Sequence, residues 1–126
     1  MGLTFVDGTV RGPSGVERSV RFLVDSGAVY TLLAQEHWKN IGLVPKRILE
    51  FMLADGSVIK RNVSECFLRI AEGEGHTPVI LGEDGDESLL GSVTLEILGL
   101  KLDPFRRTLE PMRMILARLR HSQEKR

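Results

Sequence analysis

The chain has 126 residues, of which 42% are hydrophobic, and its 17 basic and 17 acidic side chains cancel. This composition predicts one globular domain with a single core, and the balanced charge gives no support for nucleic acid or an anionic membrane as a partner. The single cysteine, Cys66, excludes an internal disulfide, and no uncharged apolar run reaches the length of a signal peptide core or a membrane span, so we expect a cytoplasmic protein.

Strands dominate the first part of the chain. Two partly alternating β-branched runs occupy Leu3 to Val24, separated by the turn-forming residues Gly12-Pro13-Ser14-Gly15, and they predict a hairpin. Asp25-Ser26-Gly27-Ala28 interrupts the second run. Tyr30 to Leu33 then resumes an extended apolar pattern.

A short helix and a second hairpin follow. Ala34 to Ile41 has the composition of a helix, centred on Ala34 to Asn40, and Gly42 is placed to end it. Ile48 to Leu53 and Val58 to Ile70 predict the two arms of a hairpin. Its turn is Ala54-Asp55-Gly56-Ser57, in which Asp-Gly is a strong hairpin signal.

The next segment alternates turns with short elements. Glu72 to Gly75 predicts a turn, Thr77 to Leu81 a strand, and Gly82 to Glu87 an acidic loop. Leu89-Leu90-Gly91 leads into Ser92 to Leu98, which we predict to be a helix capped by its serine and ended by a glycine.

The end of the chain predicts a last strand pair and an amphipathic tail. Leu100 to Asp103 and Thr108 to Pro111 are short strand candidates, whereas Met112 to Arg120 has apolar residues at a helical spacing. We therefore divide the chain into one domain, 1–111, and a basic amphipathic tail, 112–126. The tail is expected to be helical where it packs on its own subunit or across a dimer.

A carboxylate directly after a buried strand is a demanding arrangement. Asp25 follows the apolar run that ends at Val24, so its side chain is expected at the edge of a sheet or in a cleft. Ser26 supplies a hydroxyl, and Gly27 lets the backbone approach a ligand closely. By itself, Asp-Ser-Gly also fits an ordinary turn, so the motif needs its context.

That context resembles a known family. Phe22-Leu23-Val24-Asp25-Ser26-Gly27-Ala28 is similar to the active-site signature of retroviral-type (retropepsin-like) aspartic proteases, and Leu89-Leu90-Gly91 with the following helix resembles the second element of that family. The Asp55-Gly56 hairpin lies where the family has its flap. The resemblance extends from about Leu3 to Pro111, and the chain looks especially like the bacterial single-domain members of this family.

The resemblance implies a mostly β fold, a closed barrel or sandwich with a flap hairpin, and an aspartic endopeptidase. Because the chain has one Asp-Ser-Gly motif, the second aspartate would come from a second copy in a homodimer. Asp25 would be catalytic and the substrate a peptide or protein, with no metal and no cofactor. The other implied site residues are the loop supports Ser26, Gly27 and Ala28, the flap residues Ala54, Asp55, Gly56 and Ser57, and the second motif Leu89, Leu90 and Gly91.

The chain departs from the retroviral pattern at two positions. Val29 and Ser92 replace an Asp and an Arg that form a charged pair, and the flap lacks a glycine-rich run. Since both partners are missing together, no charge is orphaned, and the cleft and dimer contact are expected to change more than the fold. The alternative function is a catalytically silent dimerisation or peptide-binding module.

Other candidate sites are weaker. The three histidines lack metal-ligand spacing, and the acidic loop lacks the EF-hand pattern, so we interpret it as a solvated turn. Cys66 is expected to pack in the core, and Trp38 to be a core or interface anchor. The basic residues from Arg106 onward are interpreted as a solvated face, and they give little support for nucleic acid as a partner because no aromatic residues interleave with them.

Overall fold

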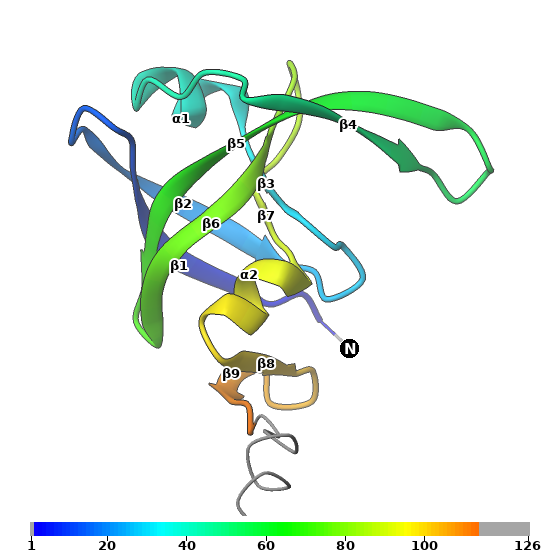
Figure 1. Cartoon of the computed structure of the whole chain (residues 1–126). Coiled ribbons are helices and arrows are strands. Elements are labelled where there is room, and N and C mark those ends of the chain that lie inside the picture. The colour runs from blue at the N-terminus through cyan, green and yellow to red at the C-terminus, as the bar shows by residue number, and fades with distance from the viewer. Residues whose placement is uncertain (1, 114–126) are drawn as a thin grey trace, which may run out of the picture.

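The computed structural model describes residues 2–113. Seven strands form one sheet in the order β1-β2-β7-β3-β6-β5-β4, and an additional pairing of β1 with β5 closes it into a barrel. The predicted mostly β class with two short helices is confirmed (Figure 1). The elements are β1 (Phe5–Arg11), β2 (Glu17–Val24), β3 (Thr31–Leu33), α1 (Gln35–Asn40), β4 (Arg47–Met52), β5 (Val58–Ile70), β6 (Gly73–Leu81), β7 (Leu89–Leu90), α2 (Ser92–Ile97), β8 (Leu100–Asp103) and β9 (Thr108–Pro111).

Both helices end where glycine was expected to end them. Gly42 follows α1 with a φ of 78° and Gly99 follows α2 with a φ of 70°, values that favour glycine because it has no Cβ. The predicted serine cap of the second helix is wrong. Gly91 is the N-cap, and Ser92 is already the first helical residue and makes no capping hydrogen bond.

The turn predicted over Glu72 to Gly75 is also misplaced, because β6 begins at Gly73 and pairs with β5 from Ile70 onward. A Cβ at Gly75 would lie 3.5 Å from Cδ2 of Leu98, and one at Gly73 would lie 3.7 Å from Cβ of the same leucine. Both distances are ordinary van der Waals contacts, so the residue that follows α2 lies directly against this part of β6, a proximity that the local sequence does not reveal.

The core fills the barrel. In β2 the alternation places Val20, Phe22 and Val24 inside, whereas Arg21 is exposed. Phe22 is fully buried, a position that contributes about 1.5–3 kcal/mol through burial of its side chain. The buried apolar cluster also includes Val10, Leu33, Ile41, Leu43, Cys66, Leu68, Ile70, Val79, Leu81, Leu90, Leu95, Leu100 and Leu109.

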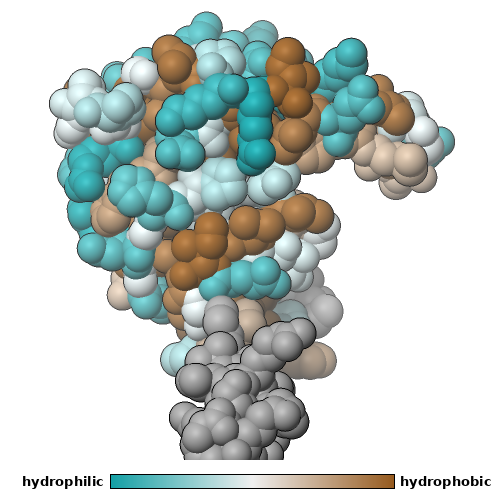
Figure 2. All heavy atoms as spheres, viewed as in Figure 1, coloured by the Kyte–Doolittle hydropathy of each residue, from teal (hydrophilic) through white to brown (hydrophobic). Residues whose placement is uncertain are grey.

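The hairpin of β4 and the first part of β5, which we call the β4–β5 arm (residues 47–60), projects from the barrel. None of its residues is buried, and Figure 2 shows apolar and polar residues together on an arm that overhangs a hollow. The arm therefore gains little stabilisation from burial of apolar side chains against the barrel.

At the other end of the chain, β8 and β9 form a separate two-stranded sheet. The backbone N–H of Met112 donates to the carbonyl of Gly99 at 2.7 Å, which joins the end of β9 to the residue that follows α2. The helix predicted from Met112 to Arg120 lies, after Arg113, outside the described residues.

Candidate active site

Asp25 lies at the end of β2, where the chain leaves the barrel. Val24 is buried, whereas Asp25 is exposed. Two backbone hydrogen bonds hold the strand end: the N–H of Val24 donates to the carbonyl of Thr4 at 2.8 Å, and the N–H of Asp25 donates to that of Leu90 at 3.0 Å. The carboxylate is thus presented to solvent from a rigid base.

The turn after Asp25 orients its carboxylate. Oδ1 accepts a hydrogen bond from the N–H of Gly27 at 3.0 Å, and the carbonyl of Asp25 accepts one from the N–H of Ala28 at 3.0 Å. A Cβ at Gly27 would lie 3.2 Å from Oδ1, which is close even for van der Waals contact. The glycine therefore lets the backbone approach the carboxylate.

The second predicted motif packs directly against this turn. The carbonyl of Leu90 accepts the N–H of Asp25. Gly91 lies so close to the segment after the Asp25 turn that a Cβ on this glycine would be 2.6 Å from the carbonyl carbon of Tyr30. Two more backbone bonds, from Ser92 to the carbonyl of Ala28 at 2.9 Å and from Val93 to that of Val29 at 2.9 Å, join the start of α2 to the residues after Gly27. The structure therefore brings the two motifs together.

A chain of buried hydroxyl groups supports the same junction. Oγ1 of Thr94 lies 2.6 Å from Oγ1 of Thr31 and 2.7 Å from Oγ1 of Thr77. Thr31 accepts the N–H of Gly91 at 3.0 Å, and Thr77 donates to the carbonyl of Pro78 at 3.3 Å. Since each hydroxyl has one proton, donation must run from Thr31 to Thr94 to Thr77. None of these three threonines was predicted as part of the site. The available signal was Thr94, a polar residue at a core position of α2.

A cavity of about 310 Å³ lies between the Asp25 turn and the β4–β5 arm, lined by residues from Gly27 to Tyr30 on one side and from Phe51 to Leu53 on the other. Tyr30 and Phe51 meet edge to face, with ring centroids 6.0 Å apart. The predicted flap residues Ala54 to Ser57 do not line this cavity; Phe51, Met52 and Leu53 do. Of the second motif, Leu89 lines the cavity, whereas Leu90 faces the core.

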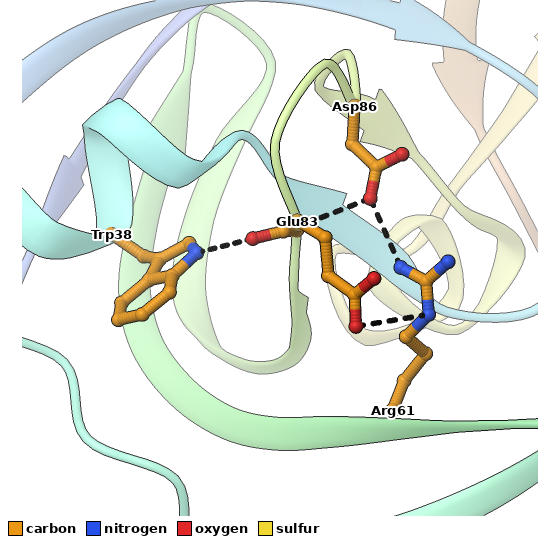
Figure 3. Close-up of polar contacts among 5 residues, drawn as sticks. Trp38, Arg61, Glu83 and Asp86 are labelled. Atoms are coloured by element: carbon orange, nitrogen blue, oxygen red, sulfur yellow. Dashed lines mark hydrogen bonds and ion pairs between the residues drawn. The ribbon is translucent and has the colours of Figure 1, made fainter.

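An ion pair that sequence analysis missed lies in the wall of the same cavity (Figure 3). Arg61 on β5 donates from Nη1 to Oδ2 of Asp86 at 3.0 Å. The acidic loop is therefore not entirely a solvated turn, because Asp86 folds onto the sheet. The available signal was the alternation of β5, which places Arg61 on the same face as Ile59 and Val63.

Trp38 packs against the core, as expected, and also positions the acidic loop. Its Nε1 donates to the carbonyl of Gly82 at 2.8 Å, at the point where the loop leaves β6 (Figure 3). The loop is thus held from α1 as well as from β5.

The arm ends in a turn closed by Asp55. Oδ1 of Asp55 accepts the hydroxyl of Ser57 at 2.6 Å and its backbone N–H at 2.9 Å, and Gly56 has a φ of 88°. The Ser57 hydroxyl, and then its N–H, hold the pKa of Asp55 below its ordinary value.

We expect acid to loosen this turn. Because the pKa is lowered in the folded protein, the carboxylate stabilises the turn at neutral pH, and this contribution is lost as pH falls from the ordinary aspartate pKa of about 3.9 through the lower folded value. The NMR shift of the Ser57 amide should titrate below the ordinary range, and Asp55→Asn should remove this titration. A midpoint at or above the ordinary pKa would contradict the assignment.

Two further candidate sites within residues 2–113 are the thiol of Cys66 and a metal site. Cys66 is buried, and burial raises the pKa of its thiol to about 12, so it packs and is not a nucleophile at neutral pH. Among residues 2–113, no three His, Cys, Asp or Glu side chains are grouped to hold a metal ion. Within the same residues, no helix is long and apolar enough to cross a membrane.

A closed barrel with an Asp-Ser-Gly turn beside a Leu-Leu-Gly strand and a short helix is the arrangement of a retropepsin-like aspartic protease. The family model for gag-polyprotein putative aspartyl protease matches residues 14–96, roughly two thirds of the chain, and the chain belongs to this family. Among solved structures, EIAV protease complexed with the inhibitor HBY-793 is 16% identical, with a TM-score of 0.61 over 81% of this chain and 93% of that chain, which shows the same fold. No curated protein matches the chain.

Proposed function

We propose that this protein is an aspartic endopeptidase that acts as a homodimer, with one Asp25 from each copy. The observation that carries the proposal is the exposed Asp25 carboxylate, held by the N–H of Gly27 at 3.0 Å beside a cavity large enough for a side chain. A carboxylate that is held in place by a backbone N–H and is also exposed to solvent is suited to contact a partner or a substrate.

A two-fold dimer follows from having one such motif per chain. Isologous contact brings the same surface of each copy together, so both Asp25 side chains would lie near the axis. Exposed apolar residues surround this surface. Leu3 and Phe5 flank Thr4, whose carbonyl accepts a hydrogen bond from the end of β2. Val29, in the segment after the Asp25 turn, is 59% exposed. Burial of these side chains would stabilise the dimer.

Peptide hydrolysis would follow from the electrostatics of two adjacent carboxyls. Both cannot ionise cheaply, so one keeps a proton while the other remains a base, and the two titrate as a coupled pair. The ionised carboxylate would take a proton from a bound water, and the resulting nucleophile would attack the peptide carbonyl while the protonated carboxyl hydrogen-bonds the carbonyl oxygen. The carboxyl that gained the proton of the water would then pass it to the amide nitrogen as the C–N bond of the tetrahedral intermediate breaks and the carbonyl re-forms, which releases an amine and an acid. No covalent intermediate with the enzyme is needed.

The other predicted residues take supporting roles in this proposal. Ser26 would contact the opposite loop across the axis, Gly27 and Ala28 would offer backbone groups to an extended peptide, and the β4–β5 arm would act as the flap. The arm's position above the cavity and its lack of buried residues support a part that closes on a ligand.

The absence of the charged pair at Val29 and Ser92 is compatible with this arrangement. The backbone bonds from Ser92 to Ala28 and from Val93 to Val29 join the same two segments without any ionised side chain. They support a folded catalytic loop, whereas dimer affinity depends on the contacts across the axis.

The test combines association and cleavage. We expect sedimentation to show a dimer at tens of micromolar, in the range of common weak dimer affinities. At the same concentration a peptide library, incubated at acidic and neutral pH, should be cut, and a statine-type transition-state mimic should stop the cutting. A stable dimer that cuts no peptide would favour the silent binding module.

A further inference from the structure

We propose that Arg61 and Asp86 select the peptide side chain that enters the cavity beneath the β4–β5 arm, and that the side chain they favour ends in a carboxamide. This inference rests on the proposed function, because it names the substrate preference of the same cleft.

The walls of the cavity are mostly apolar. Arg61 and Asp86 are the only charged residues that line it in the described part of the chain. Apolar walls accept an aliphatic stem and gain from its burial, whereas two charged groups at one place require polar partners. The main apolar wall residues are Tyr30, Leu32, Phe51, Ile59, Ile80 and Leu89.

The pair is held firmly and leaves one edge open. Oδ2 of Asp86 accepts both Nη1 of Arg61 at 3.0 Å and the N–H of Glu83 at 2.8 Å, and Nε of Arg61 lies 3.7 Å from the Glu83 carboxylate. Within residues 2–113, neither Oδ1 of Asp86 nor Nη2 of Arg61 has a hydrogen-bond or ion-pair partner. In Figure 3 these two atoms lie on the same side of the pair, away from Trp38.

This edge offers one acceptor beside one donor. A carboxamide complements it, since its NH₂ can donate to Asp86 while its oxygen accepts from Arg61. A carboxylate tip would be repelled by Asp86, an ammonium tip would be repelled by Arg61, and an apolar tip would leave both groups unpaired after water is excluded. The side chains of Arg61 and Asp86 are only 20% and 31% exposed, so their hydrogen-bonding groups are already partly removed from water.

The experiment starts from any peptide that the protein cuts. Glutamine, glutamate, lysine and methionine are placed in turn at each of three positions on either side of the scissile bond, and kcat/KM is measured. We expect glutamine to exceed the other three by about tenfold at one position or at a pair related by the two-fold axis, the size of one well-placed hydrogen-bonding contact. Methionine equal to or better than glutamine at every position overturns the proposal, as does a preference for glutamate or lysine alone.

Variants test whether Arg61 and Asp86 cause the preference for glutamine. Arg61→Met with Asp86→Leu should reverse it toward methionine. Asp84→Asn, which removes a carboxylate from the exposed part of the same loop and outside the cavity lining, should retain it. An unchanged preference in the double variant overturns the assignment. If this variant does not fold, the peptide series with the wild-type protein still decides whether the cavity prefers a carboxamide.

Binding separates this inference from the proposed reaction. Calorimetry with Asp25→Asn protein and uncut peptides should show tighter binding of the glutamine peptide. If wild-type protein cuts nothing but this binding order holds, the endopeptidase proposal fails and the cavity assignment stands. If peptides are cut without regard to side chain and bind equally well, only the cavity assignment fails.

Discussion

Replacing Asp25 by asparagine is expected to lower kcat by at least about a hundredfold while leaving the fold and the dimer intact. The amide oxygen of asparagine can still accept the N–H of Gly27, now bonded to Oδ1 at 3.0 Å, so the turn should persist. What disappears is the ionisable carboxyl that takes up and returns a proton, a role for which a positioned acid or base contributes about 10²–10⁴-fold. Peptide cleavage and sedimentation on the same preparation measure both effects.

The matched control is Asp84→Asn, which removes a carboxylate from the exposed part of the acidic loop. Its activity should equal that of the wild type. Cleavage retained at wild-type rate by Asp25→Asn would refute the mechanism, whereas loss of the dimer in that variant would mean that Asp25 acts in assembly.

Replacing Thr94 by valine should lower the free energy of unfolding by about 2–4 kcal/mol. Valine keeps the volume of threonine but leaves the Thr31 hydroxyl without an acceptor and removes the donor to Thr77, and each buried unsatisfied group costs about 1–3 kcal/mol. Thr31 and Thr94 are fully shielded from solvent, so water cannot easily replace the lost partner. Denaturant unfolding at fixed protein concentration gives the change.

Thr94→Ser separates the hydroxyl from the packing. It keeps the chain of donors and loses one methyl group, so we expect a cost of only about 1 kcal/mol. Equal destabilisation by serine and valine would show that the hydroxyl chain contributes little. Because the proposed dimer couples stability to concentration, the three proteins must be compared at several matched concentrations.

Local features of the sequence were sufficient to predict most of the helices and strands. The strands on either side of Gly12 to Gly15, the Asp55-Gly56 hairpin and the helix ends at Gly42 and Gly99 all depend on neighbouring residues, and they were predicted close to their observed positions. The resemblance around Asp25 likewise identified the family, because its signature is contiguous. By contrast, the start of β6 at Gly73 was not predicted, because the strand begins there by pairing with Ile70 of β5 although glycine is locally unfavourable in strands.

The sequence alone thus determined the mostly β class, the family and the candidate aspartate, since each is encoded in short runs of residues. Only the tertiary structure decided which side chains support that aspartate and which line the cavity. Thr31 and Thr94 are 63 positions apart and Arg61 and Asp86 are 25 apart, so their pairing depends on barrel closure and strand register. Hydrogen bonds and ion pairs of this kind act over a few ångströms in space, and spacing along the chain carries no record of that proximity.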